Sequence, residues 1–223
     1  MLEVHNWAVY DLKESVIACR NAMRLEMPEY TQEEFEASLE RAKKLAKTPN
    51  GSGHQTFLCG IRVAFDLKYP GYISPELQRY HFNDIVCSSS KMHKLVQMIE
   101  TNLDMCFNKY VSDWSKAQMK ALINEYNVIN EYRRRFLEGP DNPDDPIPAW
   151  AMNEKDWEEK RYQKWMEIVS NCPYGIELFM RCTTNYLQLK TIYKQRKKHK
   201  LKEDWGAFCE WIEQLPYFEE FIK

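Results

Sequence analysis

Gly53-His54-Gln55-Thr56 is a short turn sequence that places an imidazole directly before a segment with the pattern of a β-strand. An imidazole at the start of a strand can hold a ligand by hydrogen bonding. The alternative is a partly exposed turn histidine without a ligand. The choice depends on which other polar side chains join His54.

The segment 78–94 is strongly polar although it follows that predicted strand. An arginine fork, hydroxyl groups and a lysine are the donors that a phosphate monoester requires, because each phosphate oxygen accepts charge-assisted or neutral hydrogen bonds. The alternatives are a solvated helix face and a serine-rich turn that caps the next helix. The candidate phosphate-binding residues here are Arg79, Ser88, Ser89, Ser90 and Lys91.

A third polar group begins at Asn185, where a second predicted strand ends, and leads through a helical pattern to a basic run from Arg196 to Lys200. Cations in a last helical turn complement the helix dipole, which explains the run structurally. The functional explanation is a phosphate clamp. Nucleic-acid binding is disfavoured because the run is short and the chain as a whole is not basic.

Two segments with strict alternation of apolar and polar residues must position these groups. Residues 57–69 carry seven apolar side chains on one face, which predicts a half-buried strand. Residues 176–184 alternate in the same way. We expect the two strands to share an antiparallel sheet.

Helical patterns occupy most of the remaining chain. Thr31-Gln32-Glu33-Glu34 is a capping box, so a helix should run from there to about Ala46. Further helices are predicted at 14–24, 118–137, 157–169 and 201–215, and the first two helices precede the first predicted strand. The fold class is therefore α+β and mainly helical. We expect one domain over residues 1–223, with a surface loop at 139–148 that holds four prolines and three aspartates.

Charge and motif content exclude several function classes. Lys and Arg (31) nearly balance Asp and Glu (33), so no global field favours nucleic acid or a membrane surface. No Walker loop, G-x-G-x-x-G, G-x-S-x-G or H-E-x-x-H sequence occurs. Function must therefore come from scattered polar residues near strand and helix ends.

Cysteine usage and the N-terminal sequence indicate a cellular compartment. The seven cysteines are odd in number and form no C-x-x-C pair, so we expect reduced thiols rather than disulfides or a zinc site. The N-terminus lacks a signal-peptide layout, and no window approaches the ~20 apolar residues of a membrane span. We expect a soluble, cytoplasmic protein.

Taken together, these pieces resemble the flavin-dependent thymidylate synthases, the ThyX family. That family has Gly-His-Glu-Thr before a strand, then Arg-His-Arg, seven residues and Ser, and near its C-terminus an Asn followed by a helix with a Leu and an Arg. The similar positions here are Gly53-His54-Gln55-Thr56, Arg79-Tyr80-His81, Ser89, Asn185, Leu189 and Arg196. The resemblance covers most of the chain through scattered positions.

The resemblance implies a mixed helix-and-sheet domain that assembles as a homotetramer with FAD between subunits. It also implies reductive methylation of dUMP to dTMP, with methylenetetrahydrofolate as carbon donor and NADPH as reductant. By position, Arg79 and Ser89 would be catalytic, and the flavin would contact His54, Thr56, Arg79, His81 and Asn185. The nucleotide would contact Glu76, where the family usually has Gln, together with Ser88, Ser89, Ser90, Lys91 and Arg196.

The chain departs from the family pattern at the substrate groups. Tyr80 and His81 replace the last two letters of Arg-His-Arg, so one permanent cation is lost. Lys91 replaces an arginine, and Val169 stands at another arginine position. The alternatives are therefore a flavoprotein of the same fold with a changed nucleotide or one-carbon reaction, and a non-catalytic nucleotide-binding or interaction protein.

Cys87 stands where the family has an acidic residue that contacts the substrate. A thiolate stabilised by Arg79 or Lys91 could attack a pyrimidine ring. The favoured interpretation is a small buried thiol.

Overall fold

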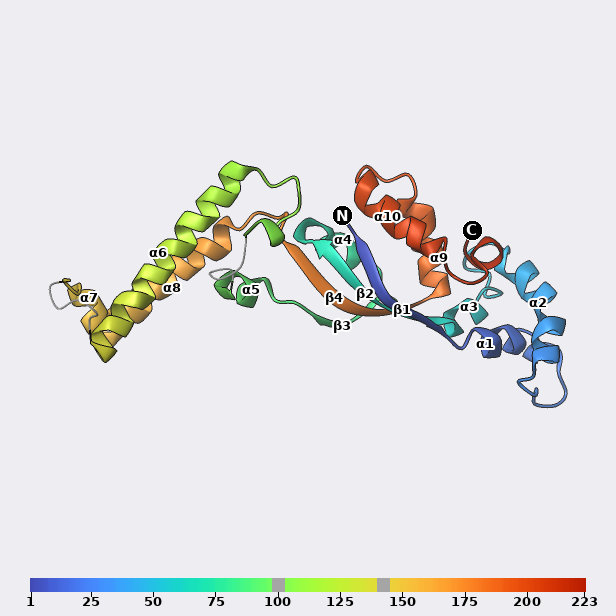
Figure 1. The fold of residues 1–223 in the computed structure, drawn as a ribbon. Coiled ribbons are helices and arrows are strands. Elements are labelled where there is room, and N and C mark those ends of the chain that lie inside the picture. The colour runs from blue at the N-terminus through green and yellow to red at the C-terminus, as the bar shows by residue number, and fades with distance from the viewer. Residues whose placement is uncertain (98–102, 140–144) are drawn as a thin grey trace. The chain divides into compact units, whose positions relative to one another are not determined.

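The computed structural model describes residues 1–97, 103–139 and 145–223 (Figure 1). The chain forms two compact units, which we name the sheet unit (Met1–Ser88 with Phe179–Lys223) and the hairpin unit (Ser89–Leu178). The sheet unit combines both ends of the sequence, and the hairpin unit lies between them in the sequence. The interpretation of residues 1–223 as one domain stays a prediction.

A four-stranded antiparallel sheet has the order β1-β2-β4-β3, which confirms a mainly helical α+β fold. β1 pairs with β2, with Ala8 opposite Ala64, and β3 pairs with β4, with Ile85 opposite Cys182. The two predicted strands are therefore neighbours in the middle of the sheet. The strands are β1 (Glu3–Tyr10), β2 (Arg62–Pro70), β3 (Asp84–Ser88) and β4 (Glu177–Asn185).

The core of the sheet unit lies on the face formed by the alternate apolar residues of β2. Phe65 is 1% exposed, and its ring centroid lies 5.9 Å from Phe208 and 4.8 Å from Trp211 on α10 (Lys202–Ile212). Aromatic pairs at these spacings add to the free energy of burying their surfaces. The sheet is therefore held by α10 on this face.

The prediction that a strand begins at residue 57 was wrong. Phe57–Gly60 is a helical turn, α3, in which the Leu58 and Cys59 amides bond to carbonyls of the preceding turn. Leu58, which the alternation placed outward, is 0% exposed. A Cβ on Gly60 would lie 2.3 Å from Ser15 Oγ, so glycine permits α3 to approach α1 (Leu12–Ala18).

The prediction that two helices precede the first strand was also wrong, because β1 comes first. The alternation in β1 is interrupted: the register with β2 shifts between His5 and Ala8, and Asn6 has a φ of 46°. A bulge of this kind adds a residue to one strand and breaks the period of two. β3 was missed as well, because all five of its residues are exposed.

The helices of the sheet unit follow the predicted pattern in part. Thr31 caps α2 by accepting a hydrogen bond from the Glu34 amide at 3.2 Å, as the capping box predicts. The helix predicted at 14–24 is divided into α1 and a 3₁₀ turn. The remaining elements are Asn21–Met23 and Gly71–Ile73 (3₁₀), α2 (Gln32–Ala46), α4 (Ser74–Leu77), α9 (Tyr186–Arg196) and a π-helical turn at Phe218–Ile222.

The hairpin unit is built on two long helices, α6 and α8, which pack side by side (Figure 1). Ser112 and Asn153 cap them by accepting hydrogen bonds from amides three residues ahead, both at 3.2 Å. Both predicted helices are confirmed, with longer bounds. The helices are α5 (Lys91–Gln97), a 3₁₀ turn (Leu103–Met105), α6 (Asp113–Glu138), α7 (Ala149–Met152) and α8 (Glu154–Asn171).

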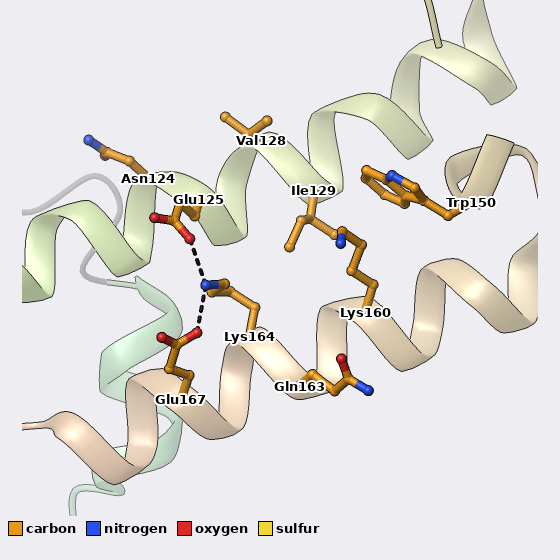
Figure 2. A pocket seen from close by; sticks show the side chains of 9 residues that line it. All are labelled: Asn124, Glu125, Val128, Ile129, Trp150, Lys160, Gln163, Lys164 and Glu167. Atoms are coloured by element: carbon orange, nitrogen blue, oxygen red, sulfur yellow. Dashed lines mark hydrogen bonds and ion pairs between the residues drawn. The ribbon is translucent and has the colours of Figure 1, made fainter. Parts of the chain in front are cut away.

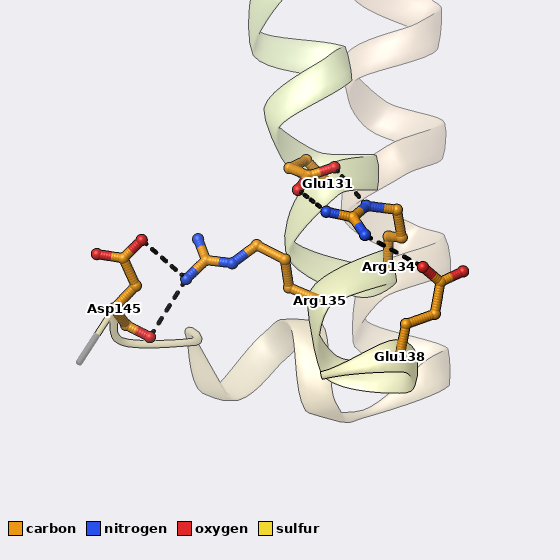
Figure 3. A network of polar contacts seen from close by, with 5 residues as sticks. All are labelled: Glu131, Arg134, Arg135, Glu138 and Asp145. Atoms are coloured by element: carbon orange, nitrogen blue, oxygen red, sulfur yellow. Dashed lines mark hydrogen bonds and ion pairs between the residues drawn. The ribbon is translucent and has the colours of Figure 1, made fainter. Parts of the chain in front are cut away.

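Charged side chains fix the end of α6, as Figure 3 shows. Arg134 pairs with Glu131 at 2.6 Å and with Glu138 at 3.1 Å, and Arg135 reaches Asp145 at 3.2 Å. Exposed pairs of this kind contribute little each, on the order of 0.3–0.5 kcal/mol. In the predicted loop at 139–148, residues 140–144 lie outside the described residues, and Gly139 ends α6 with a φ of 98°.

Lys190 on α9 is a buried lysine, 3% exposed. Its Nζ donates hydrogen bonds to the Ala46 carbonyl at 2.8 Å and to the Phe221 carbonyl at 3.0 Å. It therefore joins α9 to the end of α2 and to the last turn of the chain. Burial, with repulsion from Lys194 as a second cause, lowers the pKa of Lys190 to about 8.

We expect Lys190→Met to remove part of the pH dependence of stability. The folded-state pKa of Lys190 lies below its unfolded value, so between about pH 8 and 10.5 the unfolded chain holds more protons and the free energy of unfolding rises with pH. Below pH 8 both states hold the proton and the slope vanishes. The rise is at most about 1.4 kcal/mol per pH unit.

Denaturant unfolding at about pH 7.5, 9 and 10 checks this expectation. The wild type should gain stability relative to Lys190→Met as the pH rises. Lys198→Met removes an exposed lysine just beyond the same helix and serves as the control. Parallel curves for the wild type and Lys190→Met would contradict the expectation.

Candidate functional site

The first candidate region, which we name the His54 cavity, has a volume of about 430 Å³ in the sheet unit. That volume is in the range of small-molecule sites. Among the described residues no carboxylate lines it, and it combines apolar side chains with a guanidinium, an imidazole, a thiol and two hydroxyls. The lining residues are Ser15, Ala18, Cys19, Ala22, Arg41, Leu45, Gly53, His54, Thr56, Phe57 and Gly60.

The turn that carries His54 is fixed by its neighbours. Gly53 has a φ of 78°, a left-handed conformation that favours glycine. Gln55 is buried, and its Nε2 donates to the Ala46 carbonyl at 2.9 Å and to the Thr48 carbonyl. The Thr56 hydroxyl donates to the Gly53 carbonyl at 2.5 Å. Gln55, which lies between the two candidate residues, therefore has a structural role. His54 and Thr56 themselves are exposed.

Positive charge gathers beside this cavity. Glu34 pairs with Arg20 at 3.9 Å and with Arg24. Arg41 has no ion pair among the described residues. The Nε of Arg41 is buried and has no hydrogen-bond partner in the described part of the chain. Burial raises the pKa of the Cys19 thiol, and the nearby guanidinium groups oppose that shift.

The second region is the Glu76 cluster, which we define as Glu76, Tyr80, Arg196, His199 and Trp205. Glu76 Oε2 accepts hydrogen bonds from an Arg196 nitrogen at 2.8 Å and from Trp205 Nε1 at 2.7 Å. The guanidinium carbon of Arg196 lies 4.4 Å from the centre of the Trp205 ring. The structure therefore brings together two predicted nucleotide contacts, Glu76 and Arg196, but pairs them with each other.

Tyr80 stands where the family motif Arg-His-Arg has its histidine, and it belongs to this cluster. It is 7% exposed, and its hydroxyl accepts a hydrogen bond from Arg196 Nε at 2.5 Å. Burial raises the pKa of Tyr80, and the hydrogen bond from Arg196 offsets part of that shift. On either side of it, Arg79 and His81 are exposed.

Asn185 is buried at the junction of β4 and α9. Its side-chain oxygen accepts a hydrogen bond from the Gln188 amide at 2.9 Å and so caps α9. The geometry assigns it a structural role. Its predicted contact with a flavin stays a prediction.

The serine segment runs from the end of β3 into the hairpin unit. Ser88 is exposed, and Ser90 accepts a hydrogen bond from the His93 amide at 3.4 Å, which is a helix-capping contact. Lys91 Nζ donates to the Val169 carbonyl at 3.3 Å. Ser89 is half-buried and has a partner of its own. The capping alternative thus accounts for Ser90.

Cys87 is exposed on β3, so the interpretation as a buried thiol was wrong. An edge strand with both faces exposed gives its thiol no core to enter. All seven cysteines are free in the structure. Among the described residues no group of three potential metal ligands occurs, and no helix there is long and apolar enough to cross a membrane.

A groove of about 540 Å³ between α6 and α8 of the hairpin unit is the other candidate region (Figure 2). Lys164 lies between Glu125 at 2.6 Å and Glu167 at 2.5 Å, and Lys160 lies 5.2 Å from the centre of the Trp150 ring. These lysines interact with the hairpin itself. We therefore interpret the groove as part of the helix packing.

The comparisons with known proteins bear on the fold. The sequence matches no protein-family model and no curated protein. Two solved structures of the flavin-dependent thymidylate synthase ThyX from Helicobacter pylori, each described with FAD and dUMP, match this structure over its whole length. The TM-scores are 0.62 and 0.61, the sequence identities are 14% and 13%, and 97% and 98% of the other chains are covered.

This chain has the fold of those thymidylate synthases. The expected fold class is therefore confirmed at full length. At such identity the likeness extends to the fold alone, since a fold hosts many functions. Function must be argued from the residues of the site.

Sequence reasoning missed several residues of both regions. Arg41 lies one helical turn before Leu45 on α2, so the helical period places both on one face, but nothing in the sequence marks that face as a cavity wall. Trp205 falls within the helix predicted at 201–215, and the helical pattern alone did not distinguish it. His199, whose Nε2 lies 3.8 Å from Glu76, was assigned only to a basic run.

Proposed function

We propose that this chain is a flavoprotein that acts on a pyrimidine nucleotide, with reductive methylation of dUMP to dTMP as the first reaction to test. Methylenetetrahydrofolate would give the carbon and NADPH the reducing equivalents. The observation that carries the proposal is the likeness in fold, over the full length of the chain, to two proteins described with FAD and dUMP. The motif positions at His54, Arg79 and Ser89 support it.

The donor set of the His54 cavity fits a flavin dinucleotide. A guanidinium without an ion pair among the described residues, two hydroxyls and an imidazole line a cavity that also has apolar walls. Such a set suits a ligand that is anionic at one end and apolar at the other. When bound, the flavin supplies the electron and hydride transfer, and the protein binds and orients.

The residues predicted to bind the nucleotide fit a phosphate group less well than the His54 cavity fits a flavin. This difference favours a second candidate function. Arg196 is 12% exposed at its side chain and pairs with Glu76, so a phosphate would have to replace that carboxylate. Tyr80, which stands where the family motif has a histidine, also accepts a hydrogen bond from Arg196. The second candidate is therefore a flavoprotein of the same fold with a changed nucleotide or one-carbon reaction.

We propose a cytoplasmic homotetramer as the functional form. Three large apolar side chains exposed along the β3 edge of the sheet unit support an interface between copies, which would cover them. Phe82, Val86 and Phe179 are 60%, 62% and 62% exposed. The mass in solution tests this part of the proposal.

The visible spectrum of the purified protein tests the flavin. We expect a flavin band, or uptake of added FAD, and NADPH oxidation that dUMP stimulates. Arg79→Ala should weaken nucleotide binding much more than folding, because Arg79 is exposed. A colourless protein that takes up no FAD would overturn the proposal, whereas flavin uptake with indifference to dUMP would favour the second candidate.

A further inference from the structure

Arg41 lines the His54 cavity, and no other described residue forms an ion pair with it. Its side chain is half-buried, and its Nε has no hydrogen-bond partner among the described residues, a feature shared with Arg24 and Arg161. Arg20 and Arg24 share the nearby carboxylate of Glu34. An anion in the cavity would give the Arg41 guanidinium a counter-charge.

The surroundings of Arg41 show which kind of anion fits. Ser15 is 8% exposed and lines the same cavity, and the absence of a Cβ on Gly60 gives its hydroxyl room. His54 lies on the turn beside it, and no Asp or Glu is among the lining residues. A guanidinium, a hydroxyl and an imidazole without a competing carboxylate match the oxygens of a phosphoryl group.

The other wall of the cavity is apolar, formed by Ala18, Ala22, Leu45 and Phe57. A bare phosphate ion would leave this wall in contact with water. A phosphate ester with an organic body would cover it, and a volume of about 430 Å³ accommodates more than a phosphoryl group.

We propose that the His54 cavity is a phosphoryl-binding subsite for a phosphate ester, with Arg41 as its principal cation and Ser15 as a second donor. The phosphoryl group belongs either to a flavin nucleotide or to the nucleotide substrate. That the phosphoryl group belongs to a flavin rests on the proposed function. That the cavity binds a phosphoryl group does not depend on it. In both cases Arg41 binds the phosphoryl group and takes no part in the reaction.

Calorimetric titration with riboflavin, FMN, FAD and dUMP tests the subsite in the wild type, Arg41→Gln and Lys44→Gln. Lys44 is an exposed cation on the same helix, so its replacement makes the same change in charge outside the cavity. Hydrogen bonds to charged groups contribute about 1.5–3 kcal/mol, so Arg41→Gln should weaken phosphate-ester binding by roughly 10- to 100-fold. Riboflavin should bind Arg41→Gln and the wild type alike.

Further variants keep the test independent of folding. Arg41→Lys keeps the charge without the fork and should lose less affinity than Arg41→Gln, and Ser15→Ala should lose a few-fold by the usual size of a neutral hydrogen bond. Circular dichroism of each variant shows whether it is folded. Equal affinities of Arg41→Gln and Lys44→Gln for every phosphate ester would overturn the subsite.

The possible outcomes separate this subsite from the proposed function. Binding of dUMP that depends on Arg41, in a protein that binds no flavin, would support the subsite and reject the flavin. FMN or FAD binding that does not depend on Arg41 would reject the subsite and leave the flavoprotein proposal standing. Failure of all four ligands to bind the wild type would reject both.

Discussion

Replacement of Trp205 by Ala is expected to lower the free energy of unfolding by about 3–5 kcal/mol, the usual cost of truncating a buried large aromatic side chain. Trp205 is 0% exposed. Its ring lies 5.8 Å from Phe208 and under the Arg196 guanidinium, and its Nε1 donates to Glu76. The truncation therefore removes core packing, a cation–π contact and a hydrogen bond together.

Denaturant unfolding followed by far-ultraviolet circular dichroism measures this loss without relying on tryptophan emission. Trp114→Ala is the matched control, because Trp114 is 71% exposed and the same truncation there should cost well under about 1 kcal/mol. Trp205→Phe keeps much of the ring and loses the N–H, so it should fall between the two. A loss at Trp205 no larger than at Trp114 would contradict the central position of Trp205.

The elements that sequence reasoning predicted well are those whose signals are local. The capping box at Thr31 acts within one helical turn, and the apolar period of α6 and α8 repeats over many turns. Alternation located β4 for the same reason. Each of these signals depends on neighbours within a few residues.

The elements that were missed depend on partners far away in the sequence. β1 exists because it pairs with β2, and its bulge removes the period that would reveal it. Phe57 and Cys59 continue the alternation of β2 by coincidence, while the turn at Gly53 and the approach of Gly60 to Ser15 select a helical turn. Tertiary context overrides local preference at both places.

In the candidate site, too, local features were predicted and contacts between distant residues were not. The sequence placed His54 and Thr56 on a turn, and both line one cavity. The pairing of Glu76 with Arg196 joins residues 120 positions apart and was not foreseen. The spacing of a motif says where residues of a type stand, whereas their partners in space determine what they are free to bind.

Replacement of Glu76 tests what Arg196 is free to bind. Glu76→Ala is expected to lower the free energy of unfolding by about 2–3 kcal/mol, less than for a fully buried pair because the Glu76 side chain is 26% exposed. The loss leaves Arg196 and the Trp205 N–H without their shared acceptor. Glu76→Gln retains a side-chain oxygen, so it should cost roughly 1–2 kcal/mol.

The same variants discriminate between the two candidate functions. Glu76→Gln removes the negative charge that neutralises Arg196 and places at residue 76 the side chain usual in the family that the sequence resembles, so we expect tighter binding of dUMP by Glu76→Gln than by the wild type. Glu213→Gln, which weakens the exposed pair between Glu213 and Lys197 near the end of α9, is the control. Unchanged dUMP affinity in Glu76→Gln would make Arg196 a structural cation of the Trp205 core. The pyrimidine nucleotide would then need a different phosphate contact, and the second candidate function would be favoured.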